Sequence, residues 1–250
     1  MTSARRVLVT GGTSAVGRAI VERLVGKGDS VVVNGRSGDR GAALAEATGA
    51  VFVPGDIREP GAVESIVRAA EKSLGGLDGL VLGAGVLHTA RISETSDAAW
   101  DTVLETNLIA PFLFARACMP MLAAGDGAIV AVASGTAQWT EMELGAYSVS
   151  KRALLWMTQM LAVEGAPQGV TANAVCPGDT AGGMASLAPE PALRDLGPPI
   201  KPPLGRFTAP ADVAAAVDFF LGEEAAFCTG ASLAVDGGMR ASLRAGKVQG

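Results

Sequence analysis

Short runs of apolar, mostly β-branched residues recur along this chain and alternate with longer amphipathic stretches. The strand-like runs cover residues 7–10, 31–33, 51–53, 79–82, 128–133, 170–175 and 232–235. The helix-like stretches between them cover residues 15–26, 61–74, 98–122, 147–164 and 210–221. Continuous apolar runs are typical of parallel strands buried on both faces, and helices connect such strands by right-handed crossovers. The pattern predicts an α/β fold: a single Rossmann-like, doubly wound domain in which helices cover both faces of a seven-stranded parallel sheet.

The length of the chain suits one domain of this kind, so we expect residues 1–250 to form a single unit. A stretch rich in proline and glycine, residues 179–203, lies between the sixth strand and the last helix. It carries scattered apolar side chains, among them Met184. We expect this stretch to be a lid loop over a substrate pocket.

Charge and composition exclude several classes of protein. A net charge of −5 and a pI near 5.0 argue against a nucleic-acid partner or a basic membrane-binding patch. The chain enters its first strand without the apolar segment of a signal peptide. Its most apolar stretch, residues 108–124, is short and is interrupted by Pro111 and Pro120. We therefore expect a cytoplasmic protein that binds neither nucleic acid nor membrane, and the scattered cysteines predict no metal site.

A glycine-rich turn follows the first strand and reads Thr10-Gly11-Gly12-Thr13-Ser14-Ala15-Val16-Gly17. In doubly wound sheets, ligands bind where the carboxyl ends of the strands meet. Small residues let the backbone approach a pyrophosphate at the N-terminus of the next helix. A tight turn without a ligand is the alternative. The candidate cofactor-binding residues of this turn are Gly11, Thr13, Ser14, Ala15, Val16 and Gly17.

The second strand ends without the acidic residue that binds the adenosine ribose in many dinucleotide sites. Arg36 stands there instead, followed by Ser37, and its planar guanidinium suits a 2′-phosphate. This favours NADP(H), with NAD(H) possible and a solvated loop arginine as the alternative. After the third strand, Asp56 either hydrogen-bonds adenine or caps the next helix. Asp56 and Ile57 complete the set of candidate residues that would bind the adenosine half of the cofactor.

Tyr147, the only tyrosine, precedes Lys151 by four residues, about one helical turn. A phenol has a pKa of about 10, and a neighbouring ammonium favours the phenolate and lowers that pKa. General acid–base catalysis works best when the pKa approaches the operating pH. The pair is therefore a candidate proton-transfer unit, although an ordinary solvated helix face is the alternative for such a pair taken alone.

These features, together with four further segments, resemble the short-chain dehydrogenase/reductase family over nearly the whole chain. The turn has that family's spacing Thr-Gly-x-x-x-(Gly/Ala)-x-Gly. The further segments are Glu105-Thr106-Asn107-Leu108, Ala131-Val132-Ala133-Ser134-Gly135, Pro177-Gly178 and the end segment 229–238. The resemblance implies a catalytic tetrad that consists of Asn107, Ser134, Tyr147 and Lys151.

The resemblance also implies a function: a dehydrogenase or ketoreductase that interconverts a carbonyl and a secondary alcohol by hydride transfer at nicotinamide C4. Ser134 would hold the substrate oxygen and Tyr147 would exchange its proton. Lys151 would lower the tyrosine pKa and hold the nicotinamide ribose, while Asn107 would hold a water linking Lys151 to solvent. A catalytically silent dinucleotide-binding regulator with the same fold is the alternative.

The chain departs from the family pattern in three places. The family's Asn-Asn-Ala-Gly reads Leu82-Gly83-Ala84-Gly85, without the asparagine that usually braces the sheet. Ser14 stands where family members that prefer NADP(H) often carry a basic residue. A threonine common at Gly182 is missing, and we expect Thr180 to replace it beside the nicotinamide amide. The further candidate cofactor residues are Gly83, Ala84, Gly85, Tyr147, Lys151, Pro177, Gly178 and Thr180.

Substrate and assembly are less constrained by the sequence. With Ser134, the candidate pocket residues are His88, Trp139, Met142 and Met184, for which a core or surface position is the alternative. They suggest an uncharged or partly apolar alcohol or ketone of small or medium size.

The two long helices carry more apolar residues than one sheet contact needs, namely Leu108, Phe112, Phe114, Leu154, Leu155, Met157 and Met160. The resemblance implies a homotetramer in which these helices pair and the last strand, with Val235, forms a second interface.

Overall fold

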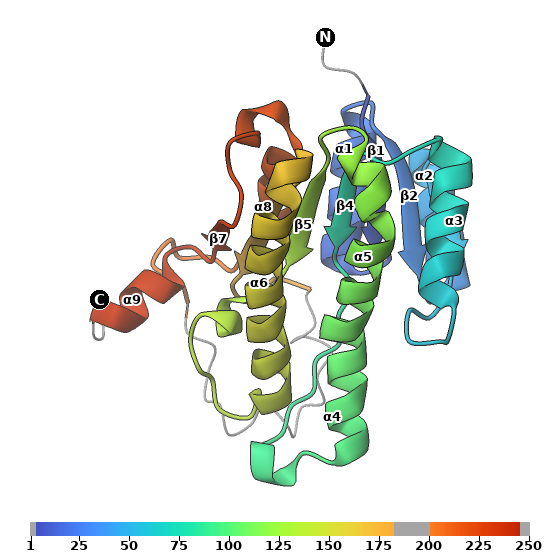
Figure 1. The fold of residues 1–250 in the computed structure, drawn as a ribbon. Coiled ribbons are helices and arrows are strands. Elements are labelled where there is room, and N and C mark those ends of the chain that lie inside the picture. The colour runs from blue at the N-terminus through green and yellow to red at the C-terminus, as the bar shows by residue number, and fades with distance from the viewer. Residues whose placement is uncertain (1–3, 183–200, 246–250) are drawn as a thin grey trace.

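A single parallel sheet runs through the computed structural model, which describes residues 4–182 and 201–245. Its strands lie in the order β3-β2-β1-β4-β5-β6-β7 (Figure 1). They are β1 (Arg6–Thr10), β2 (Ser30–Gly35), β3 (Val51–Pro54), β4 (Gly79–Leu82), β5 (Ala128–Val132), β6 (Thr171–Pro177) and β7 (Ser232–Val235). Every predicted strand is present, with ends within two residues of the prediction. The predicted doubly wound α/β fold is confirmed.

Helices connect the strands and cover the sheet. The α-helices are α1 (Ala15–Gly26), α2 (Gly38–Thr48), α3 (Ala62–Leu74), α4 (Asp97–Leu104), α5 (Ala110–Ala123), α6 (Gly145–Gly165), α8 (Pro210–Leu221) and α9 (Met239–Ala245). The short turns are η1 (Ile92–Glu94), the π-helical η2 (Glu105–Ile109), η3 (Gly135–Ala137), η4 (Ala166–Gln168) and η7 (Glu223–Ala225). The sequence pattern did not predict α2, whose alanine-rich sequence has a weak period. It forms where Ser37 caps its first turn and Gly41 lies against the ring of Phe52.

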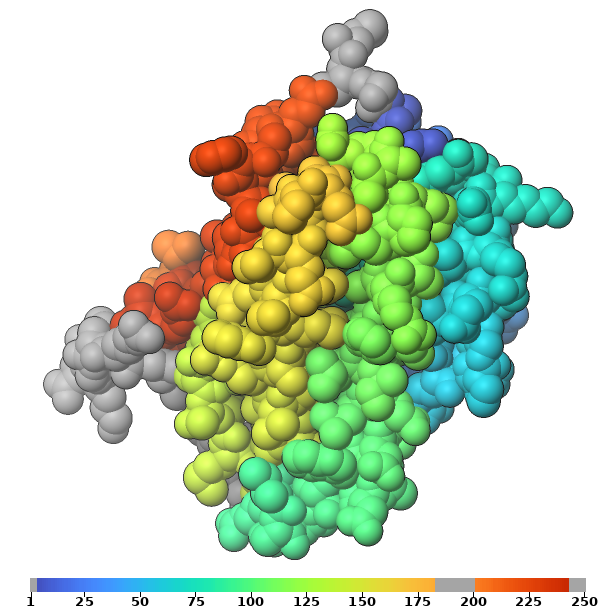
Figure 2. Space-filling view, viewed as in Figure 1, coloured from blue at the N-terminus to red at the C-terminus, as the bar shows by residue number. Residues whose placement is uncertain are grey.

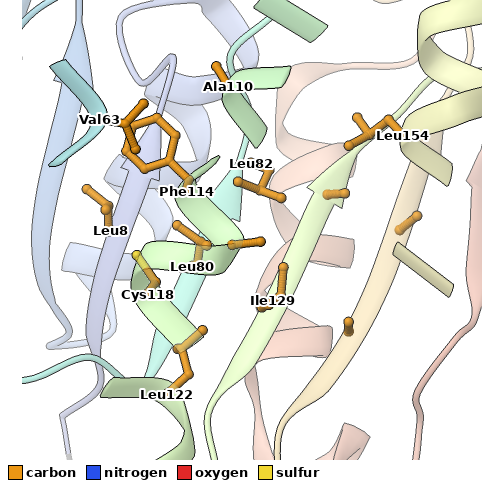
Figure 3. Packing of buried hydrophobic residues seen from close by; sticks show 14 of the residues in the cluster. Leu8, Val63, Leu80, Leu82, Ala110, Phe114, Cys118, Leu122, Ile129 and Leu154 are labelled. Carbon is orange, nitrogen blue, oxygen red and sulfur yellow. The ribbon is translucent and has the colours of Figure 1, made fainter. Parts of the chain in front are cut away.

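Alternate side chains of each strand enter two separate hydrophobic layers. Leu8 faces α3, α5 and α6, whereas Val7 and Val9 on the same strand face α1, α2 and α8. Figure 3 shows the first layer, where Leu8 and Leu80 lie near Phe114 of α5. Burial of each large apolar side chain stabilises the fold by about 1.5–3 kcal/mol. The two layers hold the sheet rigid beneath the loops that follow the carboxyl ends of its strands; this side of the sheet is called the carboxyl edge below.

The predicted helix 98–122 is one continuous helical segment, but it changes type in the middle. Helices α4 and α5 are joined by the π-helical turn η2, which contains Asn107. Pro111 lacks the N–H that an α-helix would give to the carbonyl of Asn107, and π turns occur frequently at functional sites. By length and composition alone, the 27 residues Asp97–Ala123 form a helix long and apolar enough to cross a membrane, and this segment is longer than the stretch 108–124 that was predicted to be too short. A core helix meets the same criteria, and α5 packs on the sheet through Phe114.

A buried ion cluster lies at the amino ends of the strands, called the amino edge of the sheet below. Asp218 on α8 is 3% exposed and pairs with Arg5 at 2.8 Å, Arg23 at 2.8 Å and Lys27 at 2.6 Å. Arg5 also pairs with Asp29 at 2.6 Å. These contacts tie the residue before β1 and the last turn of α1 to α8. Three cations around one carboxylate hold the pKa of Asp218 at about 2, despite its burial.

Candidate active site

The glycine-rich turn between β1 and α1 has a backbone that only glycine fits at two positions. Gly11 has φ +68°, and a Cβ there would lie 2.6 Å from Cα of Ala84. A Cβ at Gly17 would lie 2.3 Å from the carbonyl oxygen of Gly11. Ser14 caps α1 by accepting a hydrogen bond from N–H of Gly17 at 3.1 Å. The other first-turn N–H groups lack intrahelical acceptors, which makes this helix end suitable for a phosphate.

The ends of β1, β2 and β4 are held together around this turn. The hydroxyl of Thr10 accepts hydrogen bonds from N–H of Gly83 at 3.1 Å and of Ala84 at 3.3 Å. A Cβ on Gly35 would lie 2.6 Å from Oγ1 of Thr13, so the turn packs directly on the end of β2. Thr10 thus braces the loop directly after β4, which reads Gly83-Ala84-Gly85 and has no asparagine. A glycine-lined turn at a helix N-terminus fits a dinucleotide.

The predicted adenosine side contains an ion pair that sequence reasoning missed. Asp56 pairs with Arg58 at 2.8 Å, and this contact holds the pKa of Asp56 below its usual value. Asp56 does not cap α3, because the N-cap is Gly61. Arg36 is exposed at the end of β2, and its charge also lowers the pKa of Asp56. The side chain of Ile57 is 7% exposed and belongs to the core, which leaves only its backbone for a cofactor.

Tyr147 and Lys151 lie side by side on α6, and both are buried. Nζ of Lys151 lies 5.8 Å from the ring centroid of Tyr147 and donates a hydrogen bond to the carbonyl of Val132 at 2.9 Å. A Cβ on Gly85 would lie 3.3 Å from Nζ of Lys151. The predicted pair is thus brought next to the loop that follows β4, and the solvated-face alternative does not describe it.

Asn107 reaches the same place from the π turn η2. Its amide exchanges two hydrogen bonds with the backbone of Val86, at 2.8 Å and 3.0 Å. It also donates to Oγ of Ser150 at 3.0 Å, and Ser150 donates to the carbonyl of Tyr147 at 2.7 Å. The side chain of Asn107 is 0% exposed. Asn107 therefore ties the loop after β4 to the helix that carries Tyr147 and Lys151.

Ser134 lies two residues after the end of β5 and belongs to the loop that follows this strand. Its Oγ accepts hydrogen bonds from N–H of Thr136 at 3.2 Å and from the hydroxyl of Thr136 at 3.1 Å. The hydroxyl of Ser134 also acts on the Tyr147 phenol and lowers its pKa, so the two groups lie close together. The indole of Trp139 lies against Gly135, where a Cβ would come 2.1 Å from the ring. Hydroxyl, phenol and ammonium thus converge at the carboxyl edge, on the same side of the sheet as the glycine-rich turn.

Comparisons with known proteins identify the family of this chain. A protein-family model described as enoyl-(acyl carrier protein) reductase matches residues 11–240. The chain belongs to the short-chain dehydrogenase/reductase family. It is 34% identical to 2-(S)-hydroxypropyl-CoM dehydrogenase 3 of Xanthobacter autotrophicus, over 94% of this chain and 96% of that protein. It is 32% identical to D-beta-hydroxybutyrate dehydrogenase of Cupriavidus necator, over 95% and 98% of the two chains.

A solved structure gives the same result. The TT0495 protein from Thermus thermophilus matches with a TM-score of 0.84 and 34% identity, over 95% of this chain and 99% of that chain. As a member of the family, the protein is an oxidoreductase that acts on alcohol or carbonyl groups with a nicotinamide dinucleotide cofactor.

The protonation equilibria of the short-chain dehydrogenase/reductase site differ from the simple expectation for the Tyr–Lys pair. Burial raises the pKa of Tyr147 to about 12, which outweighs the lowering by the Ser134 hydroxyl. Burial also lowers the pKa of Lys151 to about 8. Both shifts have one cause, since a site withdrawn from water disfavours each charged form. The side chains alone therefore do not bring the phenol to a working pKa.

The family's third segment lies beside this site, after β6. Gly178 is held by a hydrogen bond from its N–H to the carbonyl of Val235 at 3.0 Å. Thr180 forms a bridge with Thr208 and donates its hydroxyl to the carbonyl of Gly178 at 3.0 Å. Pro177, the last residue of β6, is buried. This segment lies at the carboxyl edge, where a nicotinamide contact was predicted.

The predicted substrate residues are placed unevenly. Trp139 packs against Gly135, the residue after Ser134, and His88 is half-buried in the loop after β4. Met142 is 68% exposed, so the structure places its side chain at the surface and does not enclose it in a pocket. Met184 and most of the predicted lid 179–203 lie outside the described residues. One group was missed: Glu141, in the loop before α6, whose charge acts on the pKa of Tyr147.

Proposed function

We propose that the protein is an NADP(H)-dependent dehydrogenase or ketoreductase. It interconverts a carbonyl and a secondary alcohol on a small or medium organic substrate, with Tyr147 as the acid and base. The observation that carries this proposal is the convergence of Ser134, Tyr147 and Lys151 beside the turn between β1 and α1. Each catalytic role needs one of these groups, and a binding-only protein has no need to bury all of them together.

The roles follow from the contacts. The Ser134 hydroxyl lies close enough to the Tyr147 phenol to lower its pKa, so a substrate oxygen placed between them would receive two polar contacts. Tyr147 gives or takes the proton of that oxygen. Lys151, which has only the carbonyl of Val132 as a partner among the described residues, has N–H donors left for a ribose hydroxyl. When bound, the nicotinamide supplies the hydride chemistry and, in its oxidised form, a positive charge that favours the phenolate.

Asn107 contributes through its backbone in this proposal, because its side chain is already fully engaged with Val86 and Ser150. Pro111 leaves the Asn107 carbonyl without the hydrogen bond of a regular α-helix. A water held there would connect Lys151 to solvent and replace the proton that Tyr147 gives away. Thr180, Gly178 and the backbone of Ile57 would hold the two ends of the dinucleotide.

The decisive test is the variant Tyr147→Phe, which keeps the ring and removes only the hydroxyl. Turnover should be measured by nicotinamide absorbance over a panel of secondary alcohols and ketones. We expect a loss of about a hundredfold or more, with cofactor affinity and thermal stability retained. Activity within tenfold of the wild type would refute the assignment of Tyr147. A wild type that binds dinucleotide but turns over no substrate would favour the regulator.

The preference for NADP(H) rests on Arg36, which is exposed at the end of β2, a strand that ends without an acidic residue. The specificity constants for the two cofactors should favour NADP(H) in the wild type. Arg36→Ala should reduce that preference by about tenfold, since an arginine–phosphate contact is charge-assisted. Equal use of NAD(H) by the wild type would contradict this part of the proposal.

We also infer a homotetramer in the cytoplasm, with α5 and α6 at one interface and β7 at the second. Figure 2 shows the face that α5 and α6 form. These two helices expose apolar side chains, at Phe112 (44%), Trp156 (63%), Met160 (46%) and Val163 (71%). Three of the predicted contact residues, Phe114, Leu154 and Leu155, are instead buried in the core.

The assembly is tested best at an exposed position. Val163→Glu should split the oligomer without unfolding the chain, whereas Leu155→Asp should unfold it because Leu155 is a core residue. Light scattering at micromolar concentration measures both outcomes. A wild-type mass equal to one chain would refute the oligomer.

A further inference from the structure

The carboxylate of Asp56 is occupied by a single arginine. Arg58 donates three hydrogen bonds to it: from its backbone N–H at 3.1 Å, from Nε at 3.2 Å and from Nη2 at 2.8 Å. The two side-chain bonds form the parallel pair that makes arginine–carboxylate contacts both strong and directional. Both side chains are partly exposed, at 32% for Arg58 and 20% for Asp56. Asp56 is therefore neutralised locally by its own loop.

The strand register places this pair next to Arg36. Gly35 at the end of β2 pairs with Pro54 at the end of β3. N–H of Gly55 donates to the carbonyl of Gly35 at 3.2 Å, and the amide of Asn34 donates to the carbonyls of Val53 and Gly55. The two strand ends are thus held together; Arg36 follows β2 directly, and Asp56 follows β3 after one residue. The charge of Arg36 acts on the pKa of Asp56, which shows that the two groups lie within electrostatic range.

An unneutralised Asp56 would have two effects on a 2′-phosphate at this place. It would attract the Arg36 guanidinium and so compete with the phosphate for its donors. It would also repel the phosphate directly, at a distance where surface charges are only partly screened. Arg58 removes both effects, because its planar fork satisfies the carboxylate and adds a positive charge to the site.

We propose that Arg58 is a specificity-determining residue for the phosphorylated cofactor, because it engages Asp56 and leaves Arg36 free for the 2′-phosphate. The inference rests on the proposed preference for NADP(H) and deepens it. In this arrangement Arg58 acts through Asp56, so it is a positioning residue and its effect depends on the carboxylate. Removing the carboxylate should therefore make Arg58 dispensable for cofactor choice.

The test is a double-mutant cycle on binding, with calorimetric dissociation constants for NADP⁺ and NAD⁺ and for the fragments 2′,5′-ADP and 5′-AMP. Arg58→Ala should lower the preference for the 2′-phosphorylated ligand by about threefold to tenfold. Arg58→Ala combined with Asp56→Asn should restore most of that preference. Arg68→Ala, at an exposed position on α3, is the matched control for the loss of one positive charge and should leave the preference unchanged.

The outcomes separate the two proposals. A wild type without preference for NADP⁺ refutes the proposed cofactor and, with it, the role of Arg58. A wild type that prefers NADP⁺ while Arg58→Ala keeps the ratio, or weakens both cofactors equally, refutes the role of Arg58 alone. Failure of Asp56→Asn to restore the ratio also overturns it, because the effect would then not pass through the carboxylate. Thermal unfolding of each variant confirms that the binding data refer to folded protein.

Discussion

The two edges of the sheet each bury a charged side chain, but they treat it in opposite ways. At the amino edge, Asp218 is 3% exposed and is surrounded by three cations within 2.8 Å. At the carboxyl edge, Lys151 is 2% exposed, and within the described residues its only polar contact is the carbonyl of Val132. The pKa values reflect the difference: Asp218 stays ionised, with a pKa of about 2, whereas Lys151 loses its proton readily, with a pKa of about 8.

The difference distinguishes a buried charge that stabilises the fold from one that is suited to proton transfer. A compensated charge fixes the elements that supply its partners, here the residue before β1, α1 and α8. An uncompensated one costs stability and changes its protonation near neutral pH, which is useful only where protons move. The same reasoning applies to Tyr147, because burial raises its pKa to about 12.

The largest expected effect separates the two edges by function. Lys151→Met should lower turnover about a thousandfold or more, because it removes the charge that assists Tyr147. Its free energy of unfolding should remain the same or rise, since a buried and uncompensated ammonium is replaced by an apolar chain of similar length. Steady-state kinetics and urea unfolding on the same preparation measure both quantities. A variant that loses activity because it is unfolded would contradict the comparison.

The opposite result is expected at the amino edge. Asp218→Asn should lower the free energy of unfolding by about 2–3 kcal/mol, because three cations lose their common partner. Turnover of the folded enzyme should stay within twofold of the wild type. Glu22→Gln is the matched control, since its pair with Arg18 is exposed on α1 and should contribute about 0–1 kcal/mol. Equal losses in the two variants would show that burial of Asp218 contributes nothing.

The two edges should contribute to the pH dependence of stability in different pH ranges. The folded pKa of Asp218 lies below its ordinary value of 3.8, so the unfolded chain takes up the proton first as the pH falls. Stability should therefore drop by about 2 kcal/mol between pH 4 and pH 2, and Asp218→Asn should lack this part of the drop. Lys151 gives a slope of the same sign in an alkaline window: between pH 8 and pH 10.5 the unfolded chain holds more protons, so stability rises with pH as the cost of the buried ammonium disappears. Urea unfolding of the wild type and of each variant across both windows checks the two slopes.

The sequence predicted the features that depend on local pattern. Buried β-branched runs such as Val31 to Val33 predicted the strands, and the four-residue spacing of Tyr147 and Lys151 predicted a shared helix face. It did not predict features that arise when distant segments meet. The π turn at Asn107, the clamp between the ends of β2 and β3, and the burial that shifts both pKa values all depend on tertiary packing. The Asp56–Arg58 pair is local, with a spacing of two residues, and its place beside Arg36 becomes visible only through the strand register.

The smallest expected effect concerns two serines on α6 that differ only in their surroundings. Oγ of Ser150 accepts a hydrogen bond from Asn107 and donates one to the carbonyl of Tyr147. Oγ of Ser148 is buried and has no hydrogen-bond partner within the described residues. Ser150→Ala should therefore lower the free energy of unfolding by about 1–2 kcal/mol and reduce turnover less than tenfold, since a buried N–H of Asn107 is left without an acceptor. Ser148→Ala should be neutral or slightly stabilising. Chemical unfolding and kinetics of the two variants side by side measure this difference. If both behave alike, neutral hydrogen bonds do not order the carboxyl edge, and the contrast with the ionic amino edge would rest on Lys151 alone.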